Sequence, residues 1–225
     1  MLPGRIIDLT HALLPGQEEY GLEIETFRVP DLYPQYRSQP EDHYIMTRIR
    51  MSPHIGTHIE APYHLLQDGG DVATLPLDKL VGQALIMDFT YKMDDEAITL
   101  DDIQAYAGRI HPGDIVLLRT GRSSFYRTER AHDRPYLENE AVRWLVKRGI
   151  ACLGTDASGI EKHGAEQQVN HLTLFENNIP LVEFMNNLDQ IQSQRVLVCV
   201  LPWKMSGAEA SPVRAIAFEP TDSIP

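Results

Sequence analysis

The chain has little of three things that would point to common classes of protein. Its 225 residues include 2 cysteines, Cys152 and Cys199, each in an apolar run, which favours buried free thiols over a disulfide framework. Basic residues are outnumbered, 20 Lys and Arg against 32 Asp and Glu, and the formal net charge of −12 disfavours binding to nucleic acid or anionic membranes. No stretch approaches the roughly 18 apolar residues of a membrane span.

Further absences narrow the location and the class of enzyme. Arg5, Asp8 and His11 interrupt any apolar segment near the start, which disfavours a signal peptide and favours a cytoplasmic protein. No GxSxG nucleophile elbow is present, so a Ser-His-Asp hydrolase of that kind is not expected. Length and an ordinary share of hydrophobic residues, 43%, predict a single folded domain over residues 1–225. We expect its partner to be a small molecule.

Histidine is scarce overall but concentrated in one segment. The chain has 9 His, so a stretch of this length would hold about 0.5 by proportion, yet "PHIGTHIEAPYH" at 53–64 holds three. The prolines, the glycine and the β-branched residues disfavour a helix and predict a strand. On a strand, His54, His58 and Glu60 share one face while Ile59 faces the core. After Pro62 the chain can turn and bring His64 back over the same face.

Two imidazoles and one carboxylate are suitable ligands for Zn²⁺, Mn²⁺ or Fe²⁺ and leave open positions, as catalytic metal sites do. The alternative is a set of surface or hydrogen-bonded histidines on an edge strand. The spacing, with an apolar opposite face, favours the metal site.

Short aliphatic runs bounded by Gly, Pro, Asp or Asn predict strands along the chain, among them 5–10 and 44–60. Residues 99–107 and 138–148 carry helix start and stop signals, including a Thr N-cap candidate and a following glycine. Strands interleaved with helices predict an α/β or α+β fold with some antiparallel pairing. Residues 15–43, rich in Glu, Pro and Tyr, predict a long excursion that is either an active-site cover or an oligomer contact.

The segment "HIGTHIEAPYH" resembles the HxGTHxDxPxH signature of the cyclase family of metal-dependent hydrolases, which includes bacterial kynurenine formamidase and isatin hydrolase. "RIIDLTHAL", "GDIVLLRTG" and "HLTLFENNIPLVEFMNNL" are similar to further family segments, so the resemblance runs from residue 5 to residue 202. It implies a single swivelling β/β/α-type domain with a mixed sheet, and a homodimer or homotetramer.

Carried over by position, the resemblance implies that His54, His58 and Glu60 bind metal and that His64 is the catalytic acid/base. The family has Asp most often where this chain has Glu60. The added methylene leaves a ligand in place but can change the number and identity of the ions. The resemblance implies one or two divalent ions, Zn²⁺ or Mn²⁺.

The resemblance adds His171 and Glu183 as further metal ligands. From the residues alone, "HLTLF" predicts a helix start and "IPLVEF" a strand, so the pair could equally be a helix-terminal hydrogen bonder and a solvated strand end. The segment "LGTDASGIE" is similar to the family's GxDxxSxD, with Gly159 in place of Ser and Glu161 in place of the second Asp. We expect Asp156 to orient a ligand imidazole.

The expected chemistry is metal-assisted hydrolysis of the C–N bond of a small amide, either linear, such as an N-formyl arylamine, or cyclic, such as a lactam. A bound ion lowers the pKa of water from 15.7 to about 7, and His64 can accept a proton and return it to the leaving nitrogen. Two other functions stay open. The same ligands occur in non-haem Fe(II) oxygenases, and a non-catalytic metal-dependent binding domain would keep the fold without turnover.

Overall fold

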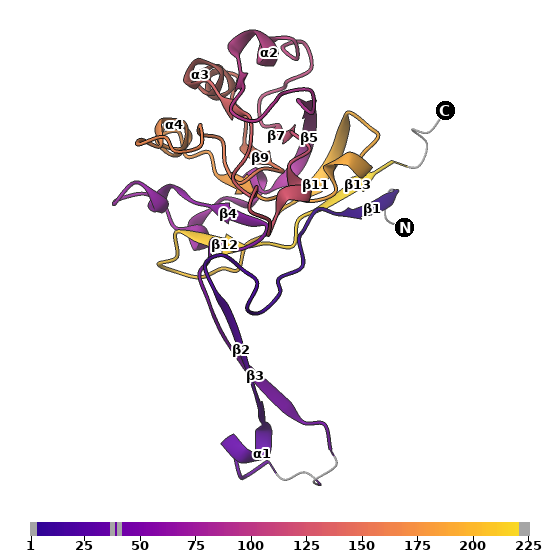
Figure 1. Cartoon of the computed structure of the whole chain (residues 1–225), viewed down its shortest axis with the longest axis vertical. Coiled ribbons are helices and arrows are strands. Elements are labelled where there is room, and N and C mark those ends of the chain that lie inside the picture. Colours follow the sequence, from indigo (N-terminus) through magenta and orange to yellow (C-terminus); the bar gives the residue numbers. More distant parts are fainter. Residues whose placement is uncertain (1–3, 37–38, 40–41, 221–225) are drawn as a thin grey trace.

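The computed structural model describes residues 4–36, 39 and 42–220. Within these residues, nine strands form one large mixed sheet that curls around an apolar interior (Figure 1). The central strands β5, β7, β9 and β10 run parallel, and the outer strands pair antiparallel. The order across the sheet is β1 (Arg5–Asp8), β13 (Ile216–Glu219), β11 (Arg195–Cys199), β5 (Val81–Asp88), β7 (Ile115–Arg119), β9 (Cys152–Thr155), β10 (Leu181–Glu183), β4 (His58–Glu60) and β12 (Ala210–Pro212).

Alternation along the central strands explains why the sheet has a core on each face. In β5, Ala84 and Ile86 belong to one apolar cluster while Leu85 and Met87 belong to the other, because successive side chains point to opposite faces of a sheet. Three helices cover the second face: α2 (Leu100–Gln104), α3 (Asn139–Lys147) and α4 (Val169–Phe175). The sheet therefore presents β10 and β4 to a layer of helices, in which α4 lies nearest the metal-ligand candidates.

The predicted mixed fold and both predicted helices are confirmed. The helix expected at 99–107 is α2. Thr99 and Asp102 form a reciprocal capping box at its start. The helix expected at 138–148 is α3, and Gly149 follows it with a φ of +74°, the left-handed conformation that commonly ends helices. Both helices are shorter than predicted, since the chain leaves them through turns.

The predicted strand 44–60 is wrong in its middle part. Residues 45–51 form β3 (Ile45–Met51) and residues 58–60 form β4, but 52–57 make a bend between them. The two strands pair with different partners, β3 with β2 (Leu22–Arg28) and β4 with β10 and β12, so the chain has to turn where it passes from one sheet to the other. The strand expected at 5–10 ends at Asp8.

Strands β2 and β3 form a two-stranded ribbon that extends away from the main sheet, with α1 (Val29–Leu32) near its far end (Figure 1). One strand of the ribbon, β2, and helix α1 fall within the excursion predicted at 15–43, of which residues 37–38 and 40–41 lie outside the described residues. A small parallel pair, β6 (Ala97–Ile98) with β8 (Tyr136–Leu137), completes the strands of the described chain. No helix within the described ranges has the length and apolar character needed to cross a membrane.

Candidate metal centre

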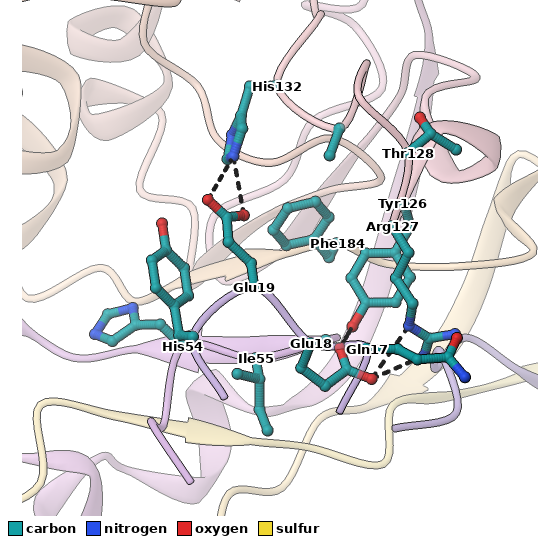
Figure 2. A pocket seen from close by; sticks show the side chains of 13 residues that line it. Gln17, Glu18, Glu19, His54, Ile55, Tyr126, Arg127, Thr128, His132 and Phe184 are labelled. Carbon is teal, nitrogen blue, oxygen red and sulfur yellow. Dashed lines mark hydrogen bonds and ion pairs between the residues drawn. The ribbon is translucent and has the colours of Figure 1, made fainter. Parts of the chain in front are cut away.

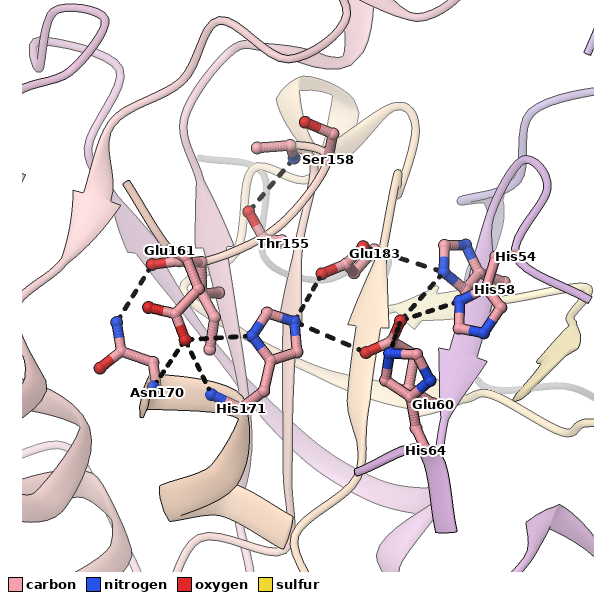
Figure 3. A network of polar contacts seen from close by, with 12 residues as sticks. His54, His58, Glu60, His64, Thr155, Ser158, Glu161, Asn170, His171 and Glu183 are labelled. Carbon is pink, nitrogen blue, oxygen red and sulfur yellow. Dashed lines mark hydrogen bonds and ion pairs between the residues drawn. The ribbon is translucent and has the colours of Figure 1, made fainter. Parts of the chain in front are cut away.

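Strand β4 presents two candidate ligands on one face. Ile59 packs into the apolar core, whereas His58 and Glu60 point the other way, toward α4 (Figure 3). In the antiparallel register with β10, Glu183 lies opposite His58 and Leu181 opposite Glu60. Side chains of directly opposed residues are neighbours on the same face. Sheet pairing therefore brings Glu183 beside the two ligands of β4.

His54 reaches the site from the bend rather than from a strand. Gly56, two residues later, has a φ of +57°, a left-handed conformation that glycine adopts without strain. His54 Nδ1 lies 3.0 Å from Glu60 Oε1, and its Nε2 lies 3.2 Å from Glu209 Oε1. The predicted place of the imidazole beside Glu60 is confirmed, but the reason is a turn and not strand alternation.

Helix α4 delivers His171 with its orientation fixed by Glu161. The Glu161 carboxylate accepts the backbone N–H of Asn170 at 2.6 Å and of His171 at 3.1 Å, and its Oε1 lies 3.2 Å from His171 Nδ1. Metal-binding imidazoles commonly have such a carboxylate on the second nitrogen. His171 Nε2 is thereby directed toward Glu60 and Glu183 (Figure 3).

The candidate ligand atoms converge around Glu60. Nε2 of His171 is 3.2 Å from Glu183 Oε1 and 3.6 Å from Glu60 Oε2. Nε2 of His58 is 3.6 Å from Glu60 Oε1 and 3.8 Å from Glu183 Oε2. The ligand atoms form two sets, and within each set all of them lie within 4.8 Å of one another. These sets are the strand group (His54, His58, Glu60) and the helix group (Glu60, His171, Glu183).

Two buried atoms in these groups fit a bound cation. Among the described residues, His58 Nε2 and Glu60 Oε2 have no hydrogen-bond partner, and leaving a buried polar atom unsatisfied costs about 1–3 kcal/mol. His58 Nδ1 donates to the Gly56 carbonyl at 2.8 Å, which leaves Nε2 as the nitrogen with a free lone pair in the neutral ring. Imidazole nitrogens and carboxylate oxygens at this spacing suit a divalent ion.

The carboxylates dominate the electrostatics of the site. Burial lowers the pKa of His58, but the contacts with Glu60 and Glu183 outweigh it and raise the pKa above its usual value. Burial also lowers the pKa of His171, but the contacts with Glu161 and Glu183 outweigh it and raise the pKa to about 10. Burial raises the pKa of Glu60, yet the neighbouring imidazoles hold it well below its usual range. A metal ion that binds here therefore competes with protons for the imidazoles.

His64 lies beside the ligands, as predicted from the turn after Pro62. The short 3-10 helix Pro62–His64 returns the side chain toward the site. The ring centroid is 4.6 Å from that of His54, and Nε2 is 3.8 Å from Glu60 Oε1. Burial lowers the pKa of His64, so the imidazole is neutral near pH 7, and 31% of its side chain remains exposed.

A cavity of about 370 Å³ lies over the site, and the side chains of the candidate ligands and His64 line it together with Arg134, Gly159 and Phe184. It shares wall residues with a second cavity of about 300 Å³ (Figure 2). Tyr20, which lines both cavities, comes from the excursion predicted at 15–43. Part of that excursion therefore does border the site.

Glu18 and Glu19 hold one wall of the second cavity by polar contacts. Glu19, which precedes Tyr20, lies 3.0 Å from His132 Nε2. Glu18 contacts both Tyr126 and Arg127, and Figure 2 shows these carboxylates turned toward the loop that carries their partners. These contacts fix the segment before the ribbon against the body of the molecule.

Asp156 does not orient a ligand imidazole, so that prediction is wrong. Its carboxylate accepts hydrogen bonds from Thr120 and from the backbone N–H of Gly121, which hold the loop after β7. Glu161 performs the expected role for His171 instead. Cys152 is fully buried in β9, and burial raises the pKa of its thiol to about 12, which makes a nucleophilic thiolate at this position unfavourable.

Known proteins match this chain over most of its length. The Cyclase family model matches residues 7–162. Kynurenine formamidase of Erythrobacter litoralis is 29% identical over 97% of this chain and 96% of that protein. Kynurenine formamidase of Bacillus cytotoxicus is 32% identical over 75% of this chain and 78% of that protein.

Two solved structures share the fold over nearly the whole chain. A protein described as a potential metal-dependent hydrolase with cyclase activity is 30% identical, with a TM-score of 0.74 over 96% of this chain and 98% of that one. Isatin hydrolase A from Labrenzia aggregata is 25% identical, with a TM-score of 0.79 over 96% and 93% of the two chains. The chain presented here thus belongs to the cyclase family.

Proposed function

We propose that this cyclase-family chain is a metal-dependent amide hydrolase that cleaves the C–N bond of a small linear or cyclic amide. The observation that carries the proposal is the convergence of two ligand groups on Glu60, with His64 beside them and a cavity above. The relatives support the reaction class, because they are named as kynurenine formamidases and an isatin hydrolase.

The ligands in this proposal are His54, His58, Glu60, His171 and Glu183. They would hold one or two divalent ions, Zn²⁺ or Mn²⁺, and Glu60 belongs to both ligand groups. When bound, a divalent ion supplies Lewis acidity, polarising the amide carbonyl and lowering the pKa of water to about 7. The chain supplies the cavity that orients the amide and the imidazole that moves the proton.

His64 is the proposed general acid/base. Its neutral imidazole can accept a proton from water and then donate it to the leaving nitrogen. The side chain borders the cavity, close to His54 and Glu60 but free of the strand pairing that fixes His58. That position favours hydrolysis over the Fe(II) oxygenase alternative, since O₂ activation has less use for such a group.

The test is elemental analysis of the purified protein together with hydrolysis of N-formylkynurenine and of isatin, with and without chelator. We expect one to two equivalents of Zn or Mn and turnover that the chelator abolishes. In His58→Ala the metal should be lost and the melting temperature lowered, because an ion that binds only the native state stabilises it. Iron with oxygen-dependent turnover would support the oxygenase, and metal without hydrolysis of any amide would support a binding domain.

We further propose that the chain assembles as a homodimer or homotetramer through the β2–β3 ribbon. The register places Leu22 opposite Met51 and Ile24 opposite Ile49, so one face of the ribbon is apolar. Ile24 and Ile49 are 46% and 47% exposed, and a two-stranded ribbon is at best marginally stable in water by itself. This apolar face adjoins a cavity also lined by Trp203.

A second copy of the chain would cover that surface. Light scattering should give a mass of two or four chains for the wild type, and Ile49→Lys should reduce it to one. A charged substitution on the opposite, polar face, Glu23→Lys, serves as the matched control. A monomeric wild type would exclude the assembly.

The net charge of −12 supports the remaining proposal about partners. An acidic chain has little affinity for nucleic acid or anionic membranes, so we propose a small molecule as the partner. We also propose a cytoplasmic location, which cell fractionation with an antibody against the chain would check.

A further inference from the structure

One arginine in the wall of the metal-site cavity has no role in the proposed reaction. Arg134 is 8% exposed and lines the cavity. Its Nε donates to the Glu161 carbonyl at 3.2 Å, and its Nη1 donates to the His132 carbonyl at 3.0 Å and to Ser158 Oγ at 2.9 Å. Within the described part of the chain, Nη2 makes no hydrogen bond. Two N–H donors of the guanidinium therefore remain for a ligand.

Arg134 also differs from the other arginines of its loop, each of which forms an ion pair: Arg122 with Asp94 at 2.7 Å, Arg127 with Glu18 at 3.0 Å and Arg130 with Asp94 at 2.6 Å. Among the described residues, no carboxylate lies within 4.0 Å of Arg134. Burial lowers its pKa, and the charges of Glu183 and Glu161 act on it from farther away. A buried cation usually has a direct partner, so Arg134 is suited to an anion that enters the cavity.

Gly159 keeps the space in front of Nη2 open. A Cβ atom at this position would lie 3.3 Å from Arg134 Nη2 and 3.2 Å from Glu183 Oε1. The backbone there has a φ of +143°, which favours glycine. A serine, the residue that the family pattern leads one to expect, would fill the space that now separates a guanidinium from a candidate metal ligand.

We propose that Arg134 binds a carboxylate that the substrate carries next to its scissile amide, and that Gly159 provides the room for it. The inference rests on the proposed amide hydrolysis and narrows its substrate class. The two free N–H groups of Nη2 can donate to carboxylate oxygens, and such charge-assisted hydrogen bonds are stronger than neutral ones. Because the same small space borders Arg134 and Glu183, the carboxylate has to lie a few bonds from the amide, as in an ortho-carboxy anilide.

A matched substrate pair tests the proposal. The probes are 2-formamidobenzoate and its neutral isostere 2-formamidobenzamide, assayed on metal-loaded wild type, Arg134→Gln and Arg134→Lys. The wild type should prefer the carboxylate in kcat/KM, and Arg134→Gln should lose about 10- to 100-fold on that substrate, the range for one hydrogen bond to a charged group. Its loss on the benzamide, whose amide oxygen carries no charge, should be smaller than its loss on the carboxylate. Arg134→Lys, which keeps the charge, should keep part of the preference.

Arg130→Gln is the matched control, because Arg130 lies in the same loop but is 55% exposed in its side chain and paired with Asp94 and Asp133. It should leave the substrate preference at the wild-type value. An equal loss on both substrates in Arg134→Gln would overturn the proposal, since it would mean that Arg134 only holds the backbone around Ser158 and Glu161. A wild type without preference for the carboxylate would overturn it as well.

A binding measurement separates this proposal from the proposed function. Calorimetric titration with 2-aminobenzoate and 2-aminobenzamide needs no turnover. If neither formamide is hydrolysed but 2-aminobenzoate binds more tightly, and that preference is lost in Arg134→Gln, the carboxylate site stands while the amide-hydrolase function fails. If both formamides are hydrolysed with equal efficiency and binding shows no preference, the amide-hydrolase function stands while the carboxylate site fails.

Discussion

The strand group and the helix group share Glu60, yet they are assembled in different ways. The strand group takes all its members from seven consecutive positions, 54–60, so local chain geometry alone places them. The helix group joins three elements, β4, α4 and β10, that only the sheet pairing and helix packing bring together. A metal centre built in this way depends on the local turn on one side and on the tertiary fold on the other.

The two groups also differ in how their outer imidazole is held. His171 is buried and tied to Glu161, whose side chain is 8% exposed. His54 is partly exposed, and its partner Glu209 has 33% of its side chain accessible. Hydrogen bonds to charged groups are worth more when water cannot compete. We therefore expect the helix group to contribute more to metal affinity and the strand group to be the side that faces substrate.

The largest effect should follow from Glu60→Ala, because Glu60 belongs to both groups. We expect metal content to fall to background, turnover to vanish, and the stabilisation of the native state by added metal to disappear; that stabilisation is about 2.7 kcal/mol at a metal concentration 100 times Kd. Elemental analysis and thermal melts with and without metal measure this. Glu60→Asp, the residue typical of the family, should retain metal. Full occupancy in Glu60→Ala would remove Glu60 from both groups.

His64→Ala should separate metal binding from proton transfer. His64 borders the strand group but belongs to neither group, so metal content should stay at the wild-type value. Turnover should fall by roughly 10² to 10⁴, the range for loss of a general acid/base. Elemental analysis and single-turnover kinetics on the same preparation distinguish the two effects. Unchanged turnover would exclude His64 from the reaction.

The sequence predicts the strand group better than the helix group, and the reason is physical. The spacing of His54, His58 and Glu60 is local, so residue types alone indicate a site even though the bend at 52–57 was missed. His171 and Glu183 come close to Glu60 only through the position of α4 and the register of β10 against β4. The family resemblance, and not the residues themselves, indicated that pair.

The wrong predictions have the same cause, because they concern contacts that only the tertiary fold creates. Asp156 is close in sequence to β9 and looked like a partner for an imidazole, but its carboxylate turns to the loop after the neighbouring strand β7. Glu161, five residues later, lies beside His171 because the chain doubles back before α4. Strand β3 lies within the strand predicted at 44–60, but its partner β2 was not predicted, since the two pair across a long connection.

Glu161→Gln should sharpen the difference between the two groups. The substitution keeps the size of the side chain but removes the charge that holds His171 Nδ1 and the start of α4. Loss of such an orienting carboxylate typically costs 10–100-fold in metal affinity. Competition with a fluorescent chelator measures that affinity, and circular dichroism checks that α4 remains folded. Wild-type affinity in a folded variant would show that His171 needs no orienting partner.

Glu209→Gln should have the smallest effect of the four. Glu209 contacts His54 at 3.2 Å, as Glu161 contacts His171 at 3.2 Å. Water, however, reaches the side chain of Glu209. Exposed pairs contribute about 0.2–1 kcal/mol, so metal affinity should fall by no more than about fivefold in the same chelator competition. A loss as large as that of Glu161→Gln would mean that exposure does not distinguish the groups, and that His54 holds the metal as firmly as His171 does.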